Sequence, residues 1–289
     1  MRNIFFSSGQ LRTVWGIAVF LLIVVSLRFA QYFVFTRQLP AQSLLMPAGL
    51  LSEEAIRVGI VLFATWVIAR IEGRKWFTYG LDGPSRLKLL TAGSMMGFLT
   101  LSALVAVLLL GGYATFSKEQ ASVQQLVCSG LVWLLAFFAV AFFEELLLRG
   151  YLQYTLSRSI GFWWAALIWS AIFAWMHVGN GGESLLGLLQ TGWMALFFCL
   201  SLRVTGSLWW AIGFHALWDW AESFFYGTPN SGLRFSHRLL TESSQGSVLW
   251  SGGSTGPEGS LFSLFVLAIP LLWLALKWRQ GHRSSYPSR

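Results

Sequence analysis

Six ionisable side chains lie inside otherwise apolar segments of the sequence: Glu144, Glu145, Arg149, His177, His215 and Asp219. A charged side chain at the centre of a bilayer costs on the order of 2.5–3.5 kcal/mol on insertion scales, so such groups are expected to share one site. Carboxylates and imidazoles are also the side chains that activate water by general acid–base catalysis. The six residues therefore predict a shared polar site, and their types indicate hydrolysis inside a membrane.

The spacing of these residues predicts which of them share a helical face. Glu145 and Arg149 are four residues apart, so they lie on one face of a helix and can form an ion pair. Glu144 is turned away from that face by about 100°, and its carboxylate stays available. His215 and Asp219 are likewise four residues apart and project from one stripe of another helix. The spacing thus predicts a mainly structural role for Glu145 and a chemical one for Glu144.

The composition places these residues in an all-α polytopic membrane protein, a bundle of about eight transmembrane helices. Hydrophobic residues make up 55% of the chain and charged residues 11%, and the mean hydropathy is +0.61. The apolar runs predict spans near residues 13–36, 44–69, 87–112, 126–148, 162–178, 185–202, 207–226 and 261–278. The net charge of +8 does not indicate a nucleic-acid partner, because the basic residues lie between the apolar runs.

The basic residues are distributed unequally over alternate loops, 14 on one side of the membrane and five on the other. The larger set is Arg2, Arg12, Arg70, Arg74, Lys75, Arg86, Lys88, Arg149, Arg158, Arg203, Lys277, Arg279, Arg283 and Arg289, and the smaller is Arg37, Arg57, Lys118, Arg234 and Arg238. Basic residues accumulate on the cytoplasmic side, so both termini are expected in the cytoplasm. Arg28, about two turns from the end of the first span, is expected to snorkel to the interface.

Two glycine-rich interruptions bear on the site. Residues 179–182 read Gly-Asn-Gly-Gly and stop a helix directly after His177, which places this histidine at a helix end. The turn expected at residues 159–161 lies midway between Glu144 and His177 in the sequence. If the helices on either side of it are antiparallel, Glu144 and His177 lie at a similar depth. The Gly/Ser-rich segment 227–260 is either a disordered linker or an ordered cap over a site.

Three motifs in this order resemble those of a known family. Residues 144–149 have the form EExxxR, residues 173–177 the form FxxxH, and residues 215–219 the form HxxxN/D. Together, on separate apolar spans, they resemble the CPBP intramembrane proteases, also called the type II CAAX prenyl endopeptidase, Abi or lysostaphin resistance protein A-like family. The resemblance covers roughly residues 126–222. It implies three parts: N-terminal transmembrane helices in 1–125, the catalytic core in 126–222, and the Gly/Ser-rich loop with the last transmembrane helix in 223–289.

The resemblance implies a role for each motif residue. Glu144 would be the general base that activates a water, His177 would assist it, and His215 with Asp219 would stabilise the oxyanion. The candidate catalytic residues are therefore Glu144, Glu145, His177, His215 and Asp219, with Arg149 in a structural ion pair. An ionised Asp219 cannot donate to an oxyanion, so it would have to be protonated, orient His215 or bind a metal.

A catalytic metal is the open alternative to this mechanism. Glu144, His177, His215 and Asp219 have the side-chain types of a zinc site, and family members are often labelled metalloendopeptidases. The sequence lacks the HExxH motif of many zinc proteases. The favoured interpretation is a reaction without a cofactor, with zinc as the alternative.

The substrate is expected to be a membrane-associated peptide or protein. The compact, Trp-rich chain is typical of a bacterial member, which would lie in the inner (plasma) membrane and would act in peptide maturation or bacteriocin self-immunity rather than on prenylated CAAX proteins. A non-catalytic immunity or scaffold protein could keep the same motifs without turnover. A transporter would also hold ionisable residues in its spans, but the sequence shows neither repeated halves nor matching broken helices.

Overall fold

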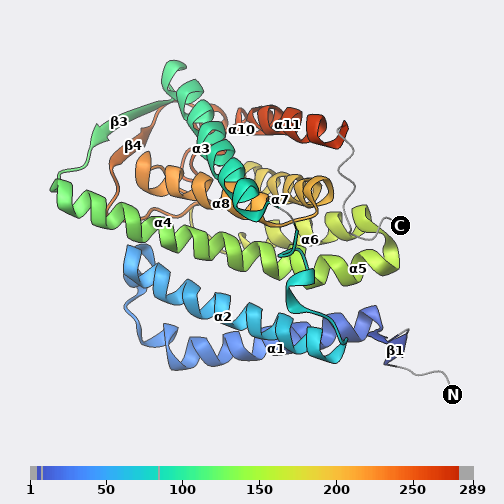
Figure 1. Cartoon of the computed structure of the whole chain (residues 1–289). Helices are drawn as coiled ribbons and strands as arrows, with labels where there is room; N and C mark the ends of the chain where they lie inside the picture. Colours follow the sequence, from blue (N-terminus) through green and yellow to red (C-terminus); the bar gives the residue numbers. More distant parts are fainter. Residues whose placement is uncertain (1–4, 8, 84, 280–289) are drawn as a thin grey trace.

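The apolar runs of the sequence form a helical bundle in the computed structural model, which describes residues 5–7, 9–83 and 85–279 (Figure 1). The main helices are α1 (Thr13–Val34), α2 (Pro47–Ile71), α3 (Arg86–Leu110), α4 (Val123–Glu145), α5 (Gln153–Ile160), α6 (Phe162–Met176), α7 (Leu185–Thr205), α8 (Trp209–Trp220) and α11 (Ala268–Arg279). The short helices are α9 (Val248–Ser251) and α10 (Ser263–Val266), and the strands are β1 (Phe6–Ser7), β2 (Gln10–Leu11), β3 (Ala114–Lys118) and β4 (Leu240–Ser244).

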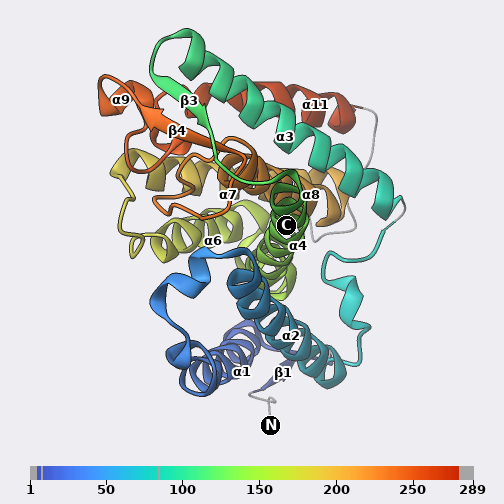
Figure 2. The same cartoon turned by 90° about the vertical axis from the view of Figure 1, so that its left-hand side faces the viewer.

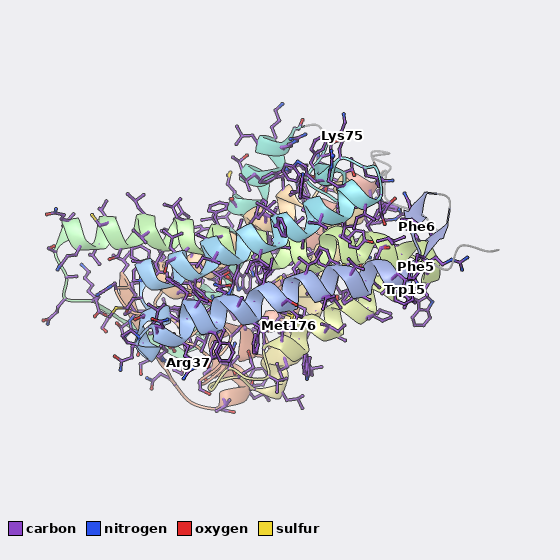
Figure 3. All side chains as sticks on the ribbon, turned by 90° about the horizontal axis from the view of Figure 1, so that it is seen from below. Phe5, Phe6, Trp15, Arg37, Lys75 and Met176 are labelled. Carbon is purple, nitrogen blue, oxygen red and sulfur yellow. The ribbon has the colours of Figure 1, made fainter. Side chains whose placement is uncertain are left out.

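Helix α4 lies in the middle of the bundle. Figures 1 and 2 show α1 and α2 on one side of it and α3, α7 and α8 on the other. A view from below shows α1 and α2 side by side, with Trp15 near one end of α1 and Arg37 near the other (Figure 3). Helix α4 begins with a capping box, in which Ser122 and Gln125 satisfy each other's backbone N–H groups. This central position lets α4 present its last turn to helices on both sides.

Among the described residues, four helical segments are long and apolar enough to cross a membrane: Thr13–Gln38, Arg86–Leu110, Val123–Ile160 and Leu185–Thr205. Helix α6 is apolar but shorter. Helix α2 is long enough but carries Glu53, Glu54 and Arg57, and α8 has only 12 residues. The last predicted span is divided into α10 and α11. The apolar all-α bundle is therefore as predicted, whereas eight full-length spans are not confirmed.

Helix α8 is held against α3 by glycines. A Cβ atom added to Gly93 would lie 2.0 Å from the backbone oxygen of Trp210, and one added to Gly97 would lie 2.2 Å from that of Phe214. Small residues let the two backbones approach closely, which is how helices associate in lipid without a hydrophobic driving force. This contact fixes the depth of His215, the residue after Phe214.

Two of the helices change to π-helix next to the motif residues. The segment η4 (Leu146–Leu152) follows Glu145 directly, and η5 (Ala221–Phe225) follows two residues after Asp219. Within η4, Gly150 has a non-helical ψ of −114°. π-Helical turns are rare and often lie at functional sites, because the extra residue in each turn redirects the side chains around it.

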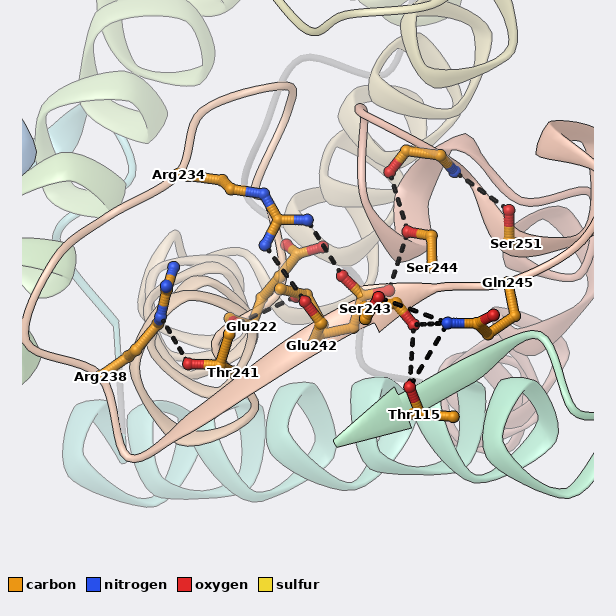
Figure 4. Close-up of polar contacts among 12 residues, drawn as sticks. Thr115, Glu222, Arg234, Arg238, Thr241, Glu242, Ser243, Ser244, Gln245 and Ser251 are labelled. Carbon is orange, nitrogen blue, oxygen red and sulfur yellow. Dashed lines mark hydrogen bonds and ion pairs between the residues drawn. The ribbon is translucent and has the colours of Figure 1, made fainter. Parts of the chain in front are cut away.

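The segment 227–260 is an ordered cap. Its strand β4 pairs antiparallel with β3, and Phe235 packs edge-on against Trp133 and Phe137. Figure 4 shows the polar contacts of the cap: Arg234 binds Glu242 at 3.2 Å, and Gln245 donates to Ser243 and to Thr115 of β3. Of the two alternatives that the sequence left open, the structure thus has the ordered cap.

Candidate active site

A cavity of about 420 Å³ opens between α1, α2, α4, α6, α7, α8 and the cap. Of the residues predicted from the sequence, Glu144, His177, His215 and Asp219 line it. Its other charged or amide-bearing lining residues are Arg28, Glu54, Arg57, Asn180, Asn230 and Glu258. The structure therefore brings together four predicted side chains from three helices, and Glu145 and Arg149 lie behind them in the protein core.

The predicted ion pair between Glu145 and Arg149 is present and completely buried. Arg149 Nη1 lies 3.2 Å from Glu145 Oε1, and neither side chain is exposed to solvent. The guanidinium also lies over the Phe173 ring, 4.5 Å from its centroid. The same Glu145 oxygen lies 3.1 Å from His215 Nδ1. Glu145 therefore has a second partner that the spacing did not predict, and it fixes the orientation of the His215 ring.

His215 stands between three carboxyl groups. Its Nε2 atom lies 3.7 Å from Glu144 Oε2 and 3.5 Å from Asp219 Oδ2, while Nδ1 faces Glu145. The Phe198 ring stacks on the imidazole with a centroid distance of 5.5 Å. Carboxylates on both ring nitrogens favour an imidazolium, because a neutral ring would direct a lone pair at one of them.

His177 lies at the end of α6, as predicted, and is oriented by the backbone. Its Nδ1 atom is 2.8 Å from the carbonyl oxygen of Phe173. A carbonyl only accepts, so Nδ1 carries the proton, and in the neutral ring Nε2 is the acceptor. The Phe173 ring contacts the imidazole at a centroid distance of 4.7 Å. His177 thus lines the cavity with a fixed tautomer, and its ring makes no direct hydrogen bond to Glu144 within the described residues.

Helix α2 supplies a charged cluster that the sequence analysis missed. Arg57 lies 2.6 Å from Glu54 Oε1 and 3.2 Å from Glu53 Oε1, and Thr36 donates to Glu53 at 2.6 Å. The other oxygen of Glu54 is buried and has no hydrogen-bond partner in the described part of the chain. The order Glu53-Glu54-Ala-Ile-Arg57 inside an apolar run was the available signal, because it resembles the pattern of α4 with one residue fewer before the arginine.

The expected snorkelling of Arg28 is wrong. Its Nη1 atom lies 3.1 Å from Glu53 Oε1, and the side chain lines the cavity. Glu53 is only 1% exposed and offers a buried counter-charge, which an isolated span viewed in sequence does not reveal. The Arg28 side chain therefore pairs with Glu53 inside the bundle and does not extend toward the membrane interface.

The cap closes one end of the cavity through Glu258. Trp218 Nε1 donates to Glu258 Oε1 at 3.0 Å, and the backbone N–H and hydroxyl of Ser231 donate to Oε2 at 3.1 and 2.7 Å. Asn180, after α6, donates to the Ser231 carbonyl at 2.8 Å. In the same loop, burial raises the pKa of the Glu183 carboxyl, and nearby Glu258 raises it further. These residues come from glycine-rich loops, where the sequence carried no signal for them.

The residues of the zinc alternative do not fit a metal site. Among residues 5–7, 9–83 and 85–279, no group of three or more His, Cys, Asp or Glu side chains is arranged to hold a metal ion.

Buried acid–imidazole groups in an apolar helical bundle define an integral membrane protein with a candidate hydrolytic site. Residues 127–221 match the family model of the Rce1-like type II CAAX prenyl endopeptidases, which confirms the resemblance to the CPBP family. The match contains all three motifs and leaves α1–α3, the whole cap and the C-terminal helices α10 and α11 outside. Neither curated proteins nor solved structures gave a significant match to the chain.

Proposed function

We propose that the protein is an intramembrane endopeptidase that hydrolyses a peptide bond of a membrane-associated peptide or protein. The observation that carries this proposal is the convergence of Glu144, His177, His215 and Asp219 on one cavity. The Rce1-like match at residues 127–221 supports the same reaction class. Residues 126–222 would form the catalytic core, with the N-terminal helices and the cap completing the cavity.

In the proposed reaction, Glu144 is the general base. A water held between Glu144 and Nε2 of His177 loses a proton to the carboxylate, and its oxygen attacks the substrate carbonyl carbon. The proton then passes to the amine nitrogen as the C–N bond breaks. His177 suits the positioning role, because its Nδ1–H is already committed to the Phe173 carbonyl and Nε2 faces no competing donor among the described residues.

His215 is the proposed oxyanion donor. Its Nε2–H, near Glu144 and Asp219, can donate to the oxygen that becomes negative in the tetrahedral intermediate. Glu145 holds the opposite ring nitrogen and is itself held by Arg149, so the ring is oriented before substrate binds. In this arrangement Asp219 acts on the oxyanion through His215 and does not need to donate a hydrogen bond itself.

The activity test uses purified protein in detergent with a library of quenched fluorescent lipopeptides. A peptidase produces fluorescence and new peptide termini that mass spectrometry identifies. A non-catalytic immunity or scaffold protein would bind peptides without producing new termini. Absence of cleavage across the library would therefore contradict the proposed peptidase activity. The identity of the cleaved peptides would define the substrate class.

For topology, we propose a bacterial plasma-membrane protein with both termini in the cytoplasm and the cap outside. The partition of basic residues supports this orientation. Arg149 is buried and Arg57 lines the cavity, so neither is a loop residue, and the larger and the smaller set of basic residues each lose one member. Arg2, Arg283 and Arg289 lie outside the described residues. Reporter fusions at Ser244 and at Arg289 should report opposite sides of the membrane. The same side for both would contradict this orientation.

A further inference from the structure

Two arginines far apart in the sequence lie beside the same tyrosine ring at the end of the bundle opposite the cap (Figure 1). Arg74 follows the end of α2, and Arg158 lies in the last turn of α5. The Tyr154 ring lies beside both, with its centroid 4.9 Å from the guanidinium carbon of Arg74 and 5.9 Å from that of Arg158. Figure 3 shows Lys75, the neighbour of Arg74, toward the same end of the molecule as Phe5 and Trp15.

Both guanidinium groups carry buried donors without acceptors. Arg74 Nε and Arg158 Nη1 are inaccessible to solvent and have no hydrogen-bond partner among residues 5–7, 9–83 and 85–279. The neighbouring acid does not supply one: Glu72 accepts hydrogen bonds from the hydroxyls of Tyr79 at 3.0 Å and Tyr151 at 3.1 Å. Even as a carboxylate, Glu72 would bring one negative charge against two positive ones.

Arginine cannot relieve this situation by losing its proton, because guanidinium stays charged in proteins. A buried donor left without an acceptor is costly, and two neighbouring cations repel one another. An anion with several acceptor oxygens would satisfy both groups, and a phosphate matches the planar donor edge of guanidinium well. The pair therefore has the composition of a phosphate site.

The position of the pair indicates where such a phosphate comes from. Helix α2 ends at Ile71 and the candidate membrane span Val123–Ile160 ends with α5, so both arginines lie at helix ends, where basic side chains of membrane proteins can meet the headgroup layer. We infer that Arg74 and Arg158 form a binding site for a phosphate group, which the headgroup of an anionic phospholipid supplies. The site is separate from the cavity and does not depend on the proposed peptidase activity.

The test measures thermal unfolding of the purified protein in detergent with added phosphatidylglycerol, phosphatidylcholine or inorganic phosphate. Phosphatidylglycerol should raise the melting temperature by roughly 2–4 °C more than phosphatidylcholine. The double variant Arg74→Gln/Arg158→Gln should lose this difference. Arg86→Gln is the matched control, because Arg86 follows the same loop but is half exposed and paired with Asp82 at 2.7 Å. It should retain the full response.

Two further measurements distinguish a lipid phosphate from free phosphate and keep the test decisive if the double variant does not fold. If inorganic phosphate stabilises the wild type equally and the double variant does not respond, the phosphate site stands with a soluble anion as its ligand. Native mass spectrometry of the wild type should show phosphatidylglycerol retained in preference to phosphatidylcholine. Equal retention of both lipids, or an unchanged lipid response in a folded double variant, would overturn the inference.

Discussion

Two adjacent glutamate pairs, each followed by an arginine, face each other across the cavity and differ in what surrounds them. On α4, Glu145 is buried against Arg149 while Glu144 lines the cavity. On α2, arginines bind both members of the pair: Glu53 contacts Arg28 and Arg57, and Glu54, which lines the cavity, contacts Arg57 at 2.6 Å. On α4, the carboxyl group that lines the cavity, that of Glu144, therefore lies beside an imidazole. On α2, the carboxyl group that lines the cavity, that of Glu54, lies beside a guanidinium.

This difference gives the glutamate pair on α4 a chemical role and the pair on α2 a structural one. Imidazole gains and loses protons near neutral pH, so Glu144 has neighbours that can take part in proton transfer. Guanidinium keeps its charge, so the α2 pair can only compensate the charge of Arg57 and hold α1 against α2 through Arg28. A pair of carboxyl groups in an apolar helix is thus not by itself catalytic; the neighbouring side chains decide its role.

The largest expected effect is on stability, from removing Arg149. Arg149→Met removes a fully buried cation from Glu145, which then keeps the contact with His215, and should lower the free energy of unfolding by about 3–5 kcal/mol. Arg57→Met should cost clearly less, because Glu53 keeps Arg28 and the Arg57 side chain is 27% exposed. Thermal unfolding in detergent compares the two. Equal losses would show that the two clusters are energetically alike.

A smaller effect distinguishes the two members of the α2 pair. Glu53→Gln weakens the contacts of Arg28, Arg57 and Thr36 at once and should cost about 1–3 kcal/mol. Glu54→Gln changes a single ion pair and should cost less, since one Glu54 oxygen already lacks a partner in the described structure. Melting temperatures of the two variants test this order. The reverse order would mean that Glu54 holds α2 in place.

The smallest effect is expected at Asp219. If Asp219 acts through His215, Asp219→Asn should keep cleavage within a few-fold of wild type, since Asn can still contact Nε2. The purified wild type should contain less than one metal ion per chain by elemental analysis. One tightly held zinc, with cleavage that a chelator abolishes and Zn²⁺ restores, together with an inactive Asn variant, would replace this mechanism with a zinc-bound water.

The sequence was sufficient for features that depend on local spacing. Four-residue spacing gave the Glu145–Arg149 pair, and the glycines after His177 gave its place at a helix end. The contact between Glu145 and His215 could not be predicted, because it depends on how α4 and α8 pack and on the π-helical turn that follows Glu145. Glu258 was missed for a related reason: nothing local determines that a glycine-rich loop folds back over α8.

The central claim is that Glu144, and not its buried neighbour, is the base. Its most direct test compares Glu144→Gln and Glu145→Gln in the lipopeptide cleavage assay, with melting temperature measured on the same samples. Glu144→Gln should fold like the wild type and lose cleavage by about 10²-fold or more, the scale of a lost general base. Glu145→Gln should instead have a lower melting temperature than the wild type, because Glu145 pairs with Arg149 in the core. Wild-type cleavage rates in a folded Glu144→Gln protein would contradict the account.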